Sequence, residues 1–376
     1  MASIYFHIPF CKQRCAYCDF YTEVAPQFID SYIDAMIAEL HLRRYYLSEN
    51  EKISSIYFGG GTPSLLSARH FEKIFYTVNK LFKIEKTAEI TFEANPDDLT
   101  ENFFDEIKNL PFNRLSIGIQ SFNDKLLKQI NRRHTAKQAV DAVQFAKNHN
   151  FTNISIDLIF GLPHQTLSDW EIELETAFLL DIEHISAYCL TYETGTPLWN
   201  MRESGKICET DEKTLNQMYL LLLQMAENQK FEHYEISNFA KRGFHSQHNS
   251  AYWKNEKYLG IGAAAHSFDH ASRQWNIPSI QKYIAAIAEN APFFEKEILT
   301  EKDKYNEYVM VSLRTTEGVD FEYIKKNFDV KFANYFSKNI QKFIFAKKIL
   351  PAANDKYSLT QEGILISNTI ISSLMM

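Results

Sequence analysis

Short apolar segments alternate with longer segments of helical periodicity through the first 230 residues of the chain. The apolar segments have the length and the residue types that are typical of strands, and they cover residues 4–8, 53–58, 88–93, 114–119, 153–160 and 184–190. The intervening segments repeat their apolar residues every three or four positions, which predicts helices over residues 28–47, 68–82, 101–109, 136–149, 168–180 and 212–228. The chain therefore predicts six repeats of a strand followed by a helix.

Six such repeats favour a parallel β-sheet, because parallel neighbours need a crossover connection. The pattern leaves two α/β architectures open, an open doubly wound sheet and a full or partial (β/α) barrel. In both of them the ligand-binding loops follow the carboxyl ends of the strands. A functional site is therefore expected in the loops that directly follow the predicted strands.

The pattern changes after residue 230. Residues 231–262 are rich in His, Asn, Tyr, Trp and Gly without a clear period, which predicts loops and short strands. From residue 301 onward, helical segments are followed by a short strand at 356–359 and a closing helix that begins after Thr360. We therefore expect a core at 1–230, a connecting region at 231–300 and a smaller, mainly helical, winged-helix-like domain at 301–376.

Composition and charge narrow the class of protein. Of the 376 residues, 45% are hydrophobic and 23% charged, and the net charge of −7 without a long run of Lys or Arg argues against sequence-independent binding of nucleic acid. The first residues lack the pattern of a leader peptide, and the apolar C-terminal tail is too short to cross a bilayer. We therefore expect a cytoplasmic protein without a transmembrane segment, in which clustered cysteines favour a metal centre over a disulfide.

Three of the five cysteines form a C-x3-C-x2-C run, Cys11, Cys15 and Cys18, just after the first predicted strand. Three thiolates on one loop can reach three corners of a 4Fe–4S cluster, which leaves one iron for a ligand from outside the protein. A zinc site is the alternative, but it takes four Cys or His ligands, and Cys189 and Cys208 lie far along the chain. The apolar alternation around Cys189 predicts a small core residue there.

Glycine and polar residues stand at the ends of several predicted strands. A glycine run before Thr62 follows the second strand, where the absence of Cβ atoms lets the backbone approach a ligand closely. Glu93, Gln120 and Asp157 lie in or at the ends of the next three strands. A polar side chain in an apolar strand is costly unless it finds a partner, and a bound polar ligand is the natural one.

The cysteine run, with the aromatic Tyr17 before its last cysteine, resembles the signature of the radical S-adenosylmethionine (SAM) superfamily. Further stretches resemble the heme chaperone HemW family, a relative of the oxygen-independent coproporphyrinogen III oxidases, over essentially the whole chain. They are Tyr-Phe-His-Ile-Pro-Phe-Cys, Gly-Gly-Gly-Thr-Pro-Ser, Arg-Leu-Ser-Ile-Gly-Ile-Gln-Ser-Phe-Asn and Asp-Leu-Ile-Phe-Gly-Leu-Pro-His-Gln-Thr. The resemblance implies a partial (β/α)6 barrel of the TIM-like radical SAM type, followed by a HemN-type C-terminal domain.

The resemblance also implies cofactors and their ligands. The open iron of the 4Fe–4S cluster would bind the amino and carboxylate groups of SAM. The remaining contacts to SAM would come from Tyr5, Tyr17, Gly60, Gly61, Thr62, Glu93, Gln120, Arg132 and Asp157. Arg132 suits this role physically, because a guanidinium group pairs well with a carboxylate.

Two further features bear on the activity. Phe20 stands where the oxidase branch carries an additional cysteine, which puts coproporphyrinogen oxidase activity, and with it an enzymatic role, in doubt. The segment that begins at His248 and ends in Tyr252 and Trp253 resembles the H-N-x-x-Y-W motif of the HemW family, which implies His248 as a ligand of heme iron. His245 is a second candidate, and His266 could instead face the SAM pocket.

The favoured prediction is a heme chaperone that carries a radical SAM cluster and delivers heme to an acceptor protein that the sequence does not name. A porphyrinogen-oxidising radical SAM enzyme is the alternative. A nucleic-acid-associated protein that uses the winged-helix-like domain is a third hypothesis, against which the acidic net charge argues.

Overall fold

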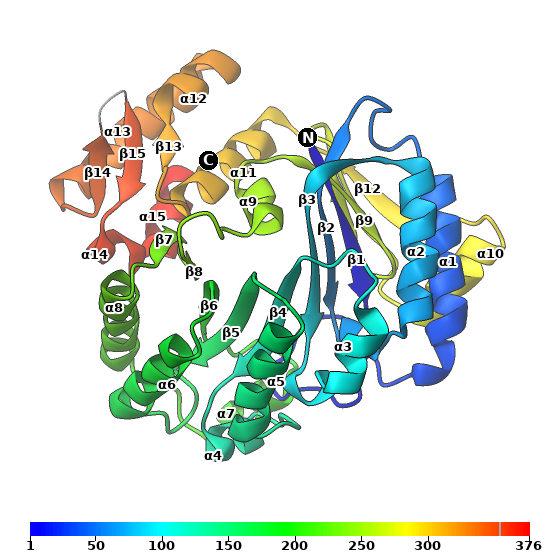
Figure 1. Cartoon of the computed structure of the whole chain (residues 1–376). Coiled ribbons are helices and arrows are strands. Elements are labelled where there is room, and N and C mark those ends of the chain that lie inside the picture. The colour runs from blue at the N-terminus through cyan, green and yellow to red at the C-terminus, as the bar shows by residue number, and fades with distance from the viewer. Residues whose placement is uncertain (353–354) are drawn as a thin grey trace.

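A curved 12-stranded sheet forms the body of the protein, and a second, three-stranded sheet belongs to the C-terminal domain (Figure 1). The structure is a computed structural model that describes residues 1–352 and 355–376. In chain order, the strands of the large sheet are β1 (Ala2–Ile8), β2 (Lys52–Gly60), β3 (Lys83–Ala94), β4 (Arg114–Gln120), β5 (Ile154–Phe160), β6 (His184–Cys189), β7 (Glu232–Glu235), β8 (Asn238–Ala240), β9 (Lys257–Ile261), β10 (His266–Phe268), β11 (Ser272–Asn276) and β12 (Phe294–Ile298).

The strands β1 to β6 are parallel neighbours in chain order, so the predicted strand–helix repeat is confirmed. The parallel strand β9 and the antiparallel strands β10 to β12 extend the sheet beyond β1, and the antiparallel strands β8 and β7 extend it beyond β6. The strand order therefore ends at β12 on one side and β7 on the other, which makes the sheet a partial barrel, as predicted.

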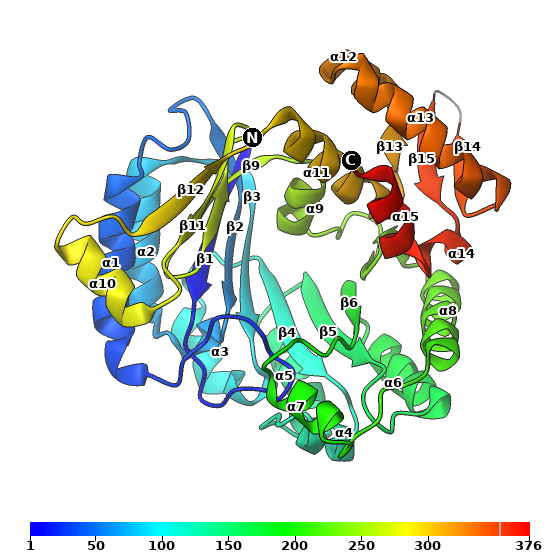
Figure 2. The same ribbon diagram turned by 180° about the vertical axis from the view of Figure 1, so that it is seen from behind.

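Helices cover the outer, convex side of the sheet (Figures 1 and 2). They are α1 (Ile29–Leu42), α2 (Ala68–Leu81), α3 (Glu101–Ile107), α5 (Ala136–Asn148), α6 (Leu167–Leu179), α8 (Glu212–Asn228) and α10 (Ile280–Ala288). The short helices α4 (Asp124–Gln129) and α7 (Pro197–Glu203) instead pack near the loop that carries the cysteines. Capping boxes at Thr135 and Thr166 begin α5 and α6, because each threonine hydroxyl accepts a hydrogen bond from a backbone N–H that has no partner inside the helix.

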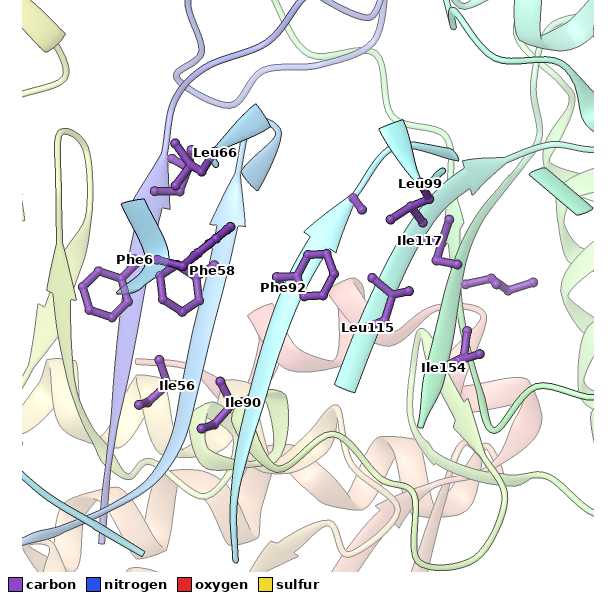
Figure 3. Close-up of a cluster of buried hydrophobic side chains, with 14 of the residues drawn as sticks. Phe6, Ile56, Phe58, Leu66, Ile90, Phe92, Leu99, Leu115, Ile117 and Ile154 are labelled. Atoms are coloured by element: carbon purple, nitrogen blue, oxygen red, sulfur yellow. The ribbon is translucent and has the colours of Figure 1, made fainter. Parts of the chain in front are cut away.

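The main core lies between these helices and the sheet (Figure 3). Phe6 of β1 stacks on Phe58 of β2 with ring centroids 4.7 Å apart, and Phe92 of β3 continues the aromatic layer through Phe112. Alternate residues of the same strands point to the concave side, where the polar side chains lie. Side chains on one face of each strand thus pack in the core, while those on the other face are available to line a functional site.

One helix, α9 (Gln247–Trp253), lies on the concave side of the sheet (Figures 1 and 2). The prediction of only loops and short strands over 231–262 was wrong at this point. The helix has only seven residues, too few for a periodic pattern to be recognised.

The C-terminal domain has a core of its own, formed around Tyr305, Phe332 and Phe336. Its elements are α11 (Glu301–Leu313), β13 (Val319–Asp320), α12 (Phe321–Asn327), α13 (Val330–Phe345), β14 (Ile349–Ala352), β15 (Lys356–Leu359), α14 (Gln361–Ile364) and α15 (Ser367–Leu374). The order of one helix, a strand, two helices and two strands is that of a winged helix. Within the described part of the chain, no helix combines the length and the apolar character that crossing a membrane requires.

Candidate functional site

A cavity of about 490 Å³ lies at the carboxyl ends of the parallel strands. The loop after β1, which carries the cysteines, closes one side of it, and the glycine run after β2 forms another. Every residue predicted to hold the cluster or SAM lines this cavity, except Tyr5. The fold therefore brings together side chains from five different strand ends, as the strand-end rule predicts.

Backbone hydrogen bonds anchor the cysteine loop at two points. Cys11 N donates to Glu23 O at 3.1 Å, and Ala16 N donates to Ile130 O at 2.9 Å, which joins the loop to the end of α4. Burial raises the pKa of the Cys11 thiol, and it raises the pKa of Cys18 to about 11. Thiols of this kind are deprotonated when a metal binds them, because the metal is the largest charge at the site.

The residues present fit a 4Fe–4S cluster. Three cysteines on one loop face a cavity, and two of their sulfur atoms accept hydrogen bonds, Cys11 Sγ from Thr62 Oγ1 at 3.5 Å and Cys15 Sγ from Arg132 Nη1 at 3.3 Å. Hydrogen bonds to the cysteine sulfurs are among the interactions that set the reduction potential of such a cluster. Among the described residues, no three His, Cys, Asp or Glu side chains are arranged to hold a single metal ion.

The glycine run is packed tightly against β1. A Cβ atom on Gly61 would lie 2.7 Å from the carbonyl oxygens of Ile8 and Phe10. Gly60 has a φ of +106°, and a Cβ atom there would lie 2.5 Å from the ring of His7. Only glycine fits at either position, and the loop backbone is thereby left bare toward the cavity.

Two buried carboxyl groups face the cavity, one from β3 and one from β5, the strands on either side of β4. Burial and the charge of Asp157 raise the pKa of Glu93 to about 7, and burial raises the pKa of Asp157 to about 6. Glu93 accepts hydrogen bonds from Tyr57 Oη at 2.8 Å and from Gly60 N at 3.1 Å, while Asp157 accepts one from Ser116 Oγ at 3.3 Å. Two neighbouring buried acids suit a ligand that brings positive charge.

Arg132, which follows α4, lines the same cavity. Its guanidinium group donates to Cys15 Sγ, to Asn95 Oδ1 at 2.6 Å and to the carbonyl oxygen of Gly118. Its Nε is buried and has no hydrogen-bond partner within residues 1–352 and 355–376. Gln120, at the end of β4, also lines the cavity and has a φ of +69°.

Tyr5 and His248 lie deeper in the concave side, outside the lining of the cavity. The Tyr5 hydroxyl is hydrogen-bonded to His7 Nδ1 at 3.1 Å. His248 is only 2% exposed, and both of its ring nitrogens are engaged, Nδ1 with Ser55 Oγ at 2.9 Å and Nε2 with Tyr252 Oη at 3.0 Å. Burial lowers the pKa of His248 to about 3, so its imidazole is neutral.

A carboxylate from the sheet holds the helix that carries His248. Glu89 of β3, which is 4% exposed, accepts hydrogen bonds from Gln247 N and His248 N, each at 3.0 Å, and from Ser246 Oγ at 3.3 Å. A negative charge at a helix N-terminus is stabilising, since it pairs with N–H groups that the helix itself leaves unpaired. Glu89 therefore fixes where α9 begins and how His248 is oriented.

The other histidine candidates lie apart from the cavity. His245 Nε2 pairs with Glu232 Oε2 at 2.9 Å, and His266 is exposed at the start of β10, opposite Trp275 of β11. Neither is among the residues that line the cavity.

Cys189 and Asn95 are among the residues that line the cavity although the sequence did not predict them there. Cys189, predicted to be a core residue, is exposed at the end of β6 and faces the cavity, so that prediction was wrong. Asn95, two positions after Glu93, contacts both Arg132 and Thr62. Asn95 directly follows the carboxyl end of β3, and this position could have identified it as a candidate site residue. Phe20, 63% exposed, lies at the same cavity.

Comparisons with known proteins place the chain in a family. Residues 5–177 match the Radical SAM superfamily, and residues 299–366 match the HemN C-terminal domain. The chain is 34% identical to the heme chaperone HemW of Lactococcus lactis, covering 100% of this chain and 97% of that protein. It is also 34% identical to the heme chaperone HemW of Bacillus subtilis, with 100% and 99% covered.

The fold has a solved counterpart in the coproporphyrinogen III oxidase HemN of Escherichia coli. The TM-score is 0.85 at 22% identity, with 100% of this chain and 90% of that chain covered, and at this identity the likeness concerns the fold. Membership of the radical SAM superfamily implies a 4Fe–4S cluster and SAM as cofactors. Full-length similarity above 30%, together with the three-cysteine loop at the mouth of a partial barrel, shows that this chain belongs to the HemW family of the radical SAM superfamily.

Proposed function

We propose that this protein is a heme chaperone, which binds heme and transfers it to an acceptor protein, and that it carries a 4Fe–4S cluster and SAM at the mouth of its barrel. The observation that carries the proposal is the full-length similarity to two proteins named heme chaperone HemW. Phe20 supports it, since an exposed hydrophobic residue stands at the cavity in place of a further cysteine. The cytoplasm, where thiols stay reduced, is the compartment that such a cluster favours.

At the mouth, Cys11, Cys15 and Cys18 would hold the cluster. Gly60 and Gly61 would leave room for the methionyl part of SAM. When bound and reduced, the cluster supplies an electron that can cleave the sulfonium C–S bond of SAM, which is chemistry of the cofactor and not of the chain.

The charges around the cavity would orient SAM. The Arg132 guanidinium group suits the SAM carboxylate, and the buried Glu93 and Asp157 suit its ammonium and sulfonium charges. Thr62 and Arg132 would donate to the cluster sulfur atoms, and the walls of the cavity would exclude water from the reacting groups.

Heme would bind on the concave side through His248. A neutral imidazole is a good axial ligand, and Tyr252 and Trp253 present flat aromatic surface to a porphyrin. Ligation through Nε2 would replace the hydrogen bond between this atom and the Tyr252 hydroxyl. Heme binding thus calls for a displacement of α9 or of Tyr252, because His248 is buried.

The experiment is a hemin titration of protein whose cluster has been rebuilt anoxically with iron and sulfide. Wild-type protein is expected to give a saturable Soret band, His248→Ala a weaker or shifted one, and His266→Ala the wild-type spectrum. His266 is the matched control, because its imidazole is exposed and lies on a different element. Absence of saturable binding by the wild type contradicts the proposal.

Oxygen-independent oxidation of coproporphyrinogen III is the second candidate function. The fold shared with the Escherichia coli oxidase favours it, and so does the presence around one cavity of every candidate SAM contact except Tyr5. Phe20 argues against it. Anaerobic incubation with coproporphyrinogen III, SAM and a reductant tests this candidate. Formation of the decarboxylated product would show the oxidase activity, and the absence of product would exclude it.

A further inference from the structure

A single side chain connects the hydrogen bonds to two of the three candidate cluster thiolates. Asn95 Oδ1 accepts from Arg132 Nη2 at 2.6 Å, and Asn95 Nδ2 donates to Thr62 Oγ1 at 3.2 Å. Arg132 and Thr62 in turn donate to Cys15 Sγ and Cys11 Sγ. The resemblance to known families assigned no role to Asn95.

The chemistry of the groups fixes the direction of every bond in this chain. A guanidinium group has only donors, so the amide atom that faces Arg132 must be the oxygen. The amide nitrogen then faces Thr62 and donates to its hydroxyl oxygen. The single hydroxyl hydrogen of Thr62 is therefore left for Cys11 Sγ, which lies 3.5 Å away.

The surroundings keep Asn95 in place. It directly follows β3 and precedes Pro96, the first residue of a short 3-10 helix (Pro96–Asp98). Arg132 is held independently by the carbonyl oxygen of Gly118. Asn95 thus decides chiefly where the Thr62 hydrogen points.

We propose that Asn95 is a positioning residue, which directs the Thr62 hydroxyl at the Cys11 sulfur and thereby raises the reduction potential of the cluster. Hydrogen bonds to the sulfur ligands stabilise the more electron-rich, reduced state of an iron–sulfur cluster. The inference rests on the proposed function, because it requires that Cys11 holds the cluster.

The test compares reduction potentials of the anoxically rebuilt cluster, measured by EPR-monitored redox titration without SAM. Asn95→Asp keeps the size of the side chain and the contact with Arg132, but a carboxylate only accepts, so it takes the Thr62 hydrogen away from sulfur. Thr62→Val removes the same hydrogen without adding charge. Both variants are expected to shift the reduction potential to more negative values. Thr62→Ser keeps the hydroxyl group and is expected to keep the wild-type potential.

The double variant separates the hydrogen bond from the added charge. If Asn95 acts through Thr62, the combined shift of Asn95→Asp and Thr62→Val is smaller than the sum of the two single shifts. Equal potentials in all variants, or fully additive shifts, overturn the inference. The EPR signal comes only from protein that holds a cluster, so incomplete cluster loading does not change the measured potential. If the Asn95→Asp variant does not take up a cluster, Asn95→Ala replaces it.

The inference and the proposed function fail in different ways. Wild-type protein that binds no iron and sulfide contradicts the cluster itself, and with it the proposed function. If the wild-type protein holds a cluster but its reduction potential is unchanged in the Thr62 and Asn95 variants, only the positioning role is contradicted.

Discussion

Removing the hydroxyl group of Tyr252 is expected to strengthen heme binding. In the protein without heme, His248 Nε2 is hydrogen-bonded to Tyr252 Oη at 3.0 Å, and this bond competes with ligation of iron at the same atom. Tyr252→Phe removes the competitor and keeps an aromatic ring for the porphyrin. The Ser55 bond to Nδ1 remains in the variant and keeps the imidazole oriented.

The size of the effect follows from the cost of one hydrogen bond. A net contribution of about 0.5–1.5 kcal/mol corresponds to an affinity gain of about 2- to 12-fold, since about 1.4 kcal/mol is a factor of ten. The assay is a hemin titration followed at the Soret band, with the dissociation constant as readout. Tyr258→Phe is the matched control, because Tyr258 packs edge-on against Tyr252 with ring centroids 4.7 Å apart and makes no hydrogen bond to His248.

Two results would refute this reasoning. If Tyr252→Phe leaves the affinity unchanged or weakens it, Nε2 is not the atom that binds iron. If Tyr258→Phe raises the affinity equally, the gain comes from loosening the aromatic cluster and not from freeing His248.

Three further predictions concern the carboxyl groups and the glycine run. Burial raises the pKa of Glu173 from 4.5 to about 8, so its protonated form stabilises the fold at low pH and this contribution is lost as the pH rises to about 8. Between these two pKa values, Glu173→Gln should reduce the pH dependence of the unfolding free energy by about 1.4 kcal/mol per pH unit, measured by urea unfolding. The control is Glu175→Gln, which should keep the wild-type slope because Glu175 is exposed. Burial raises the pKa of Glu93 to about 7, and only its carboxylate form suits a cationic ligand. The affinity for SAM, measured by equilibrium dialysis, should therefore fall about tenfold for each pH unit below about 7. An affinity that does not change with pH would exclude Glu93 as the partner of SAM. Gly60→Ala should destabilise the protein by about 1–3 kcal/mol, seen as a lower Tm, since its φ is +106° and the new Cβ meets the His7 ring; an unchanged Tm would mean that the loop is free to rearrange.

The core of the fold was predictable from local spacing. Strand and helix periods each depend on a few neighbouring residues, so the six repeats and the cysteine loop could be identified without knowledge of distant contacts. The rule that ligands bind at the carboxyl ends of parallel strands then placed Glu93, Gln120 and Asp157 around one cavity. That prediction needed only the chain order of the strands.

The sequence by itself determined the repeats, the three-cysteine loop and the strand ends that meet at the mouth of the barrel. The tertiary structure alone decided that Ser55 and Tyr252 engage His248, that Glu89 holds the start of α9, and that Asn95 joins Arg132 to Thr62. These contacts join residues that are mostly far apart in the chain, and they depend on strand register and on which face of the sheet a side chain occupies. Periodicity predicts which elements form, whereas their packing determines which polar groups satisfy one another.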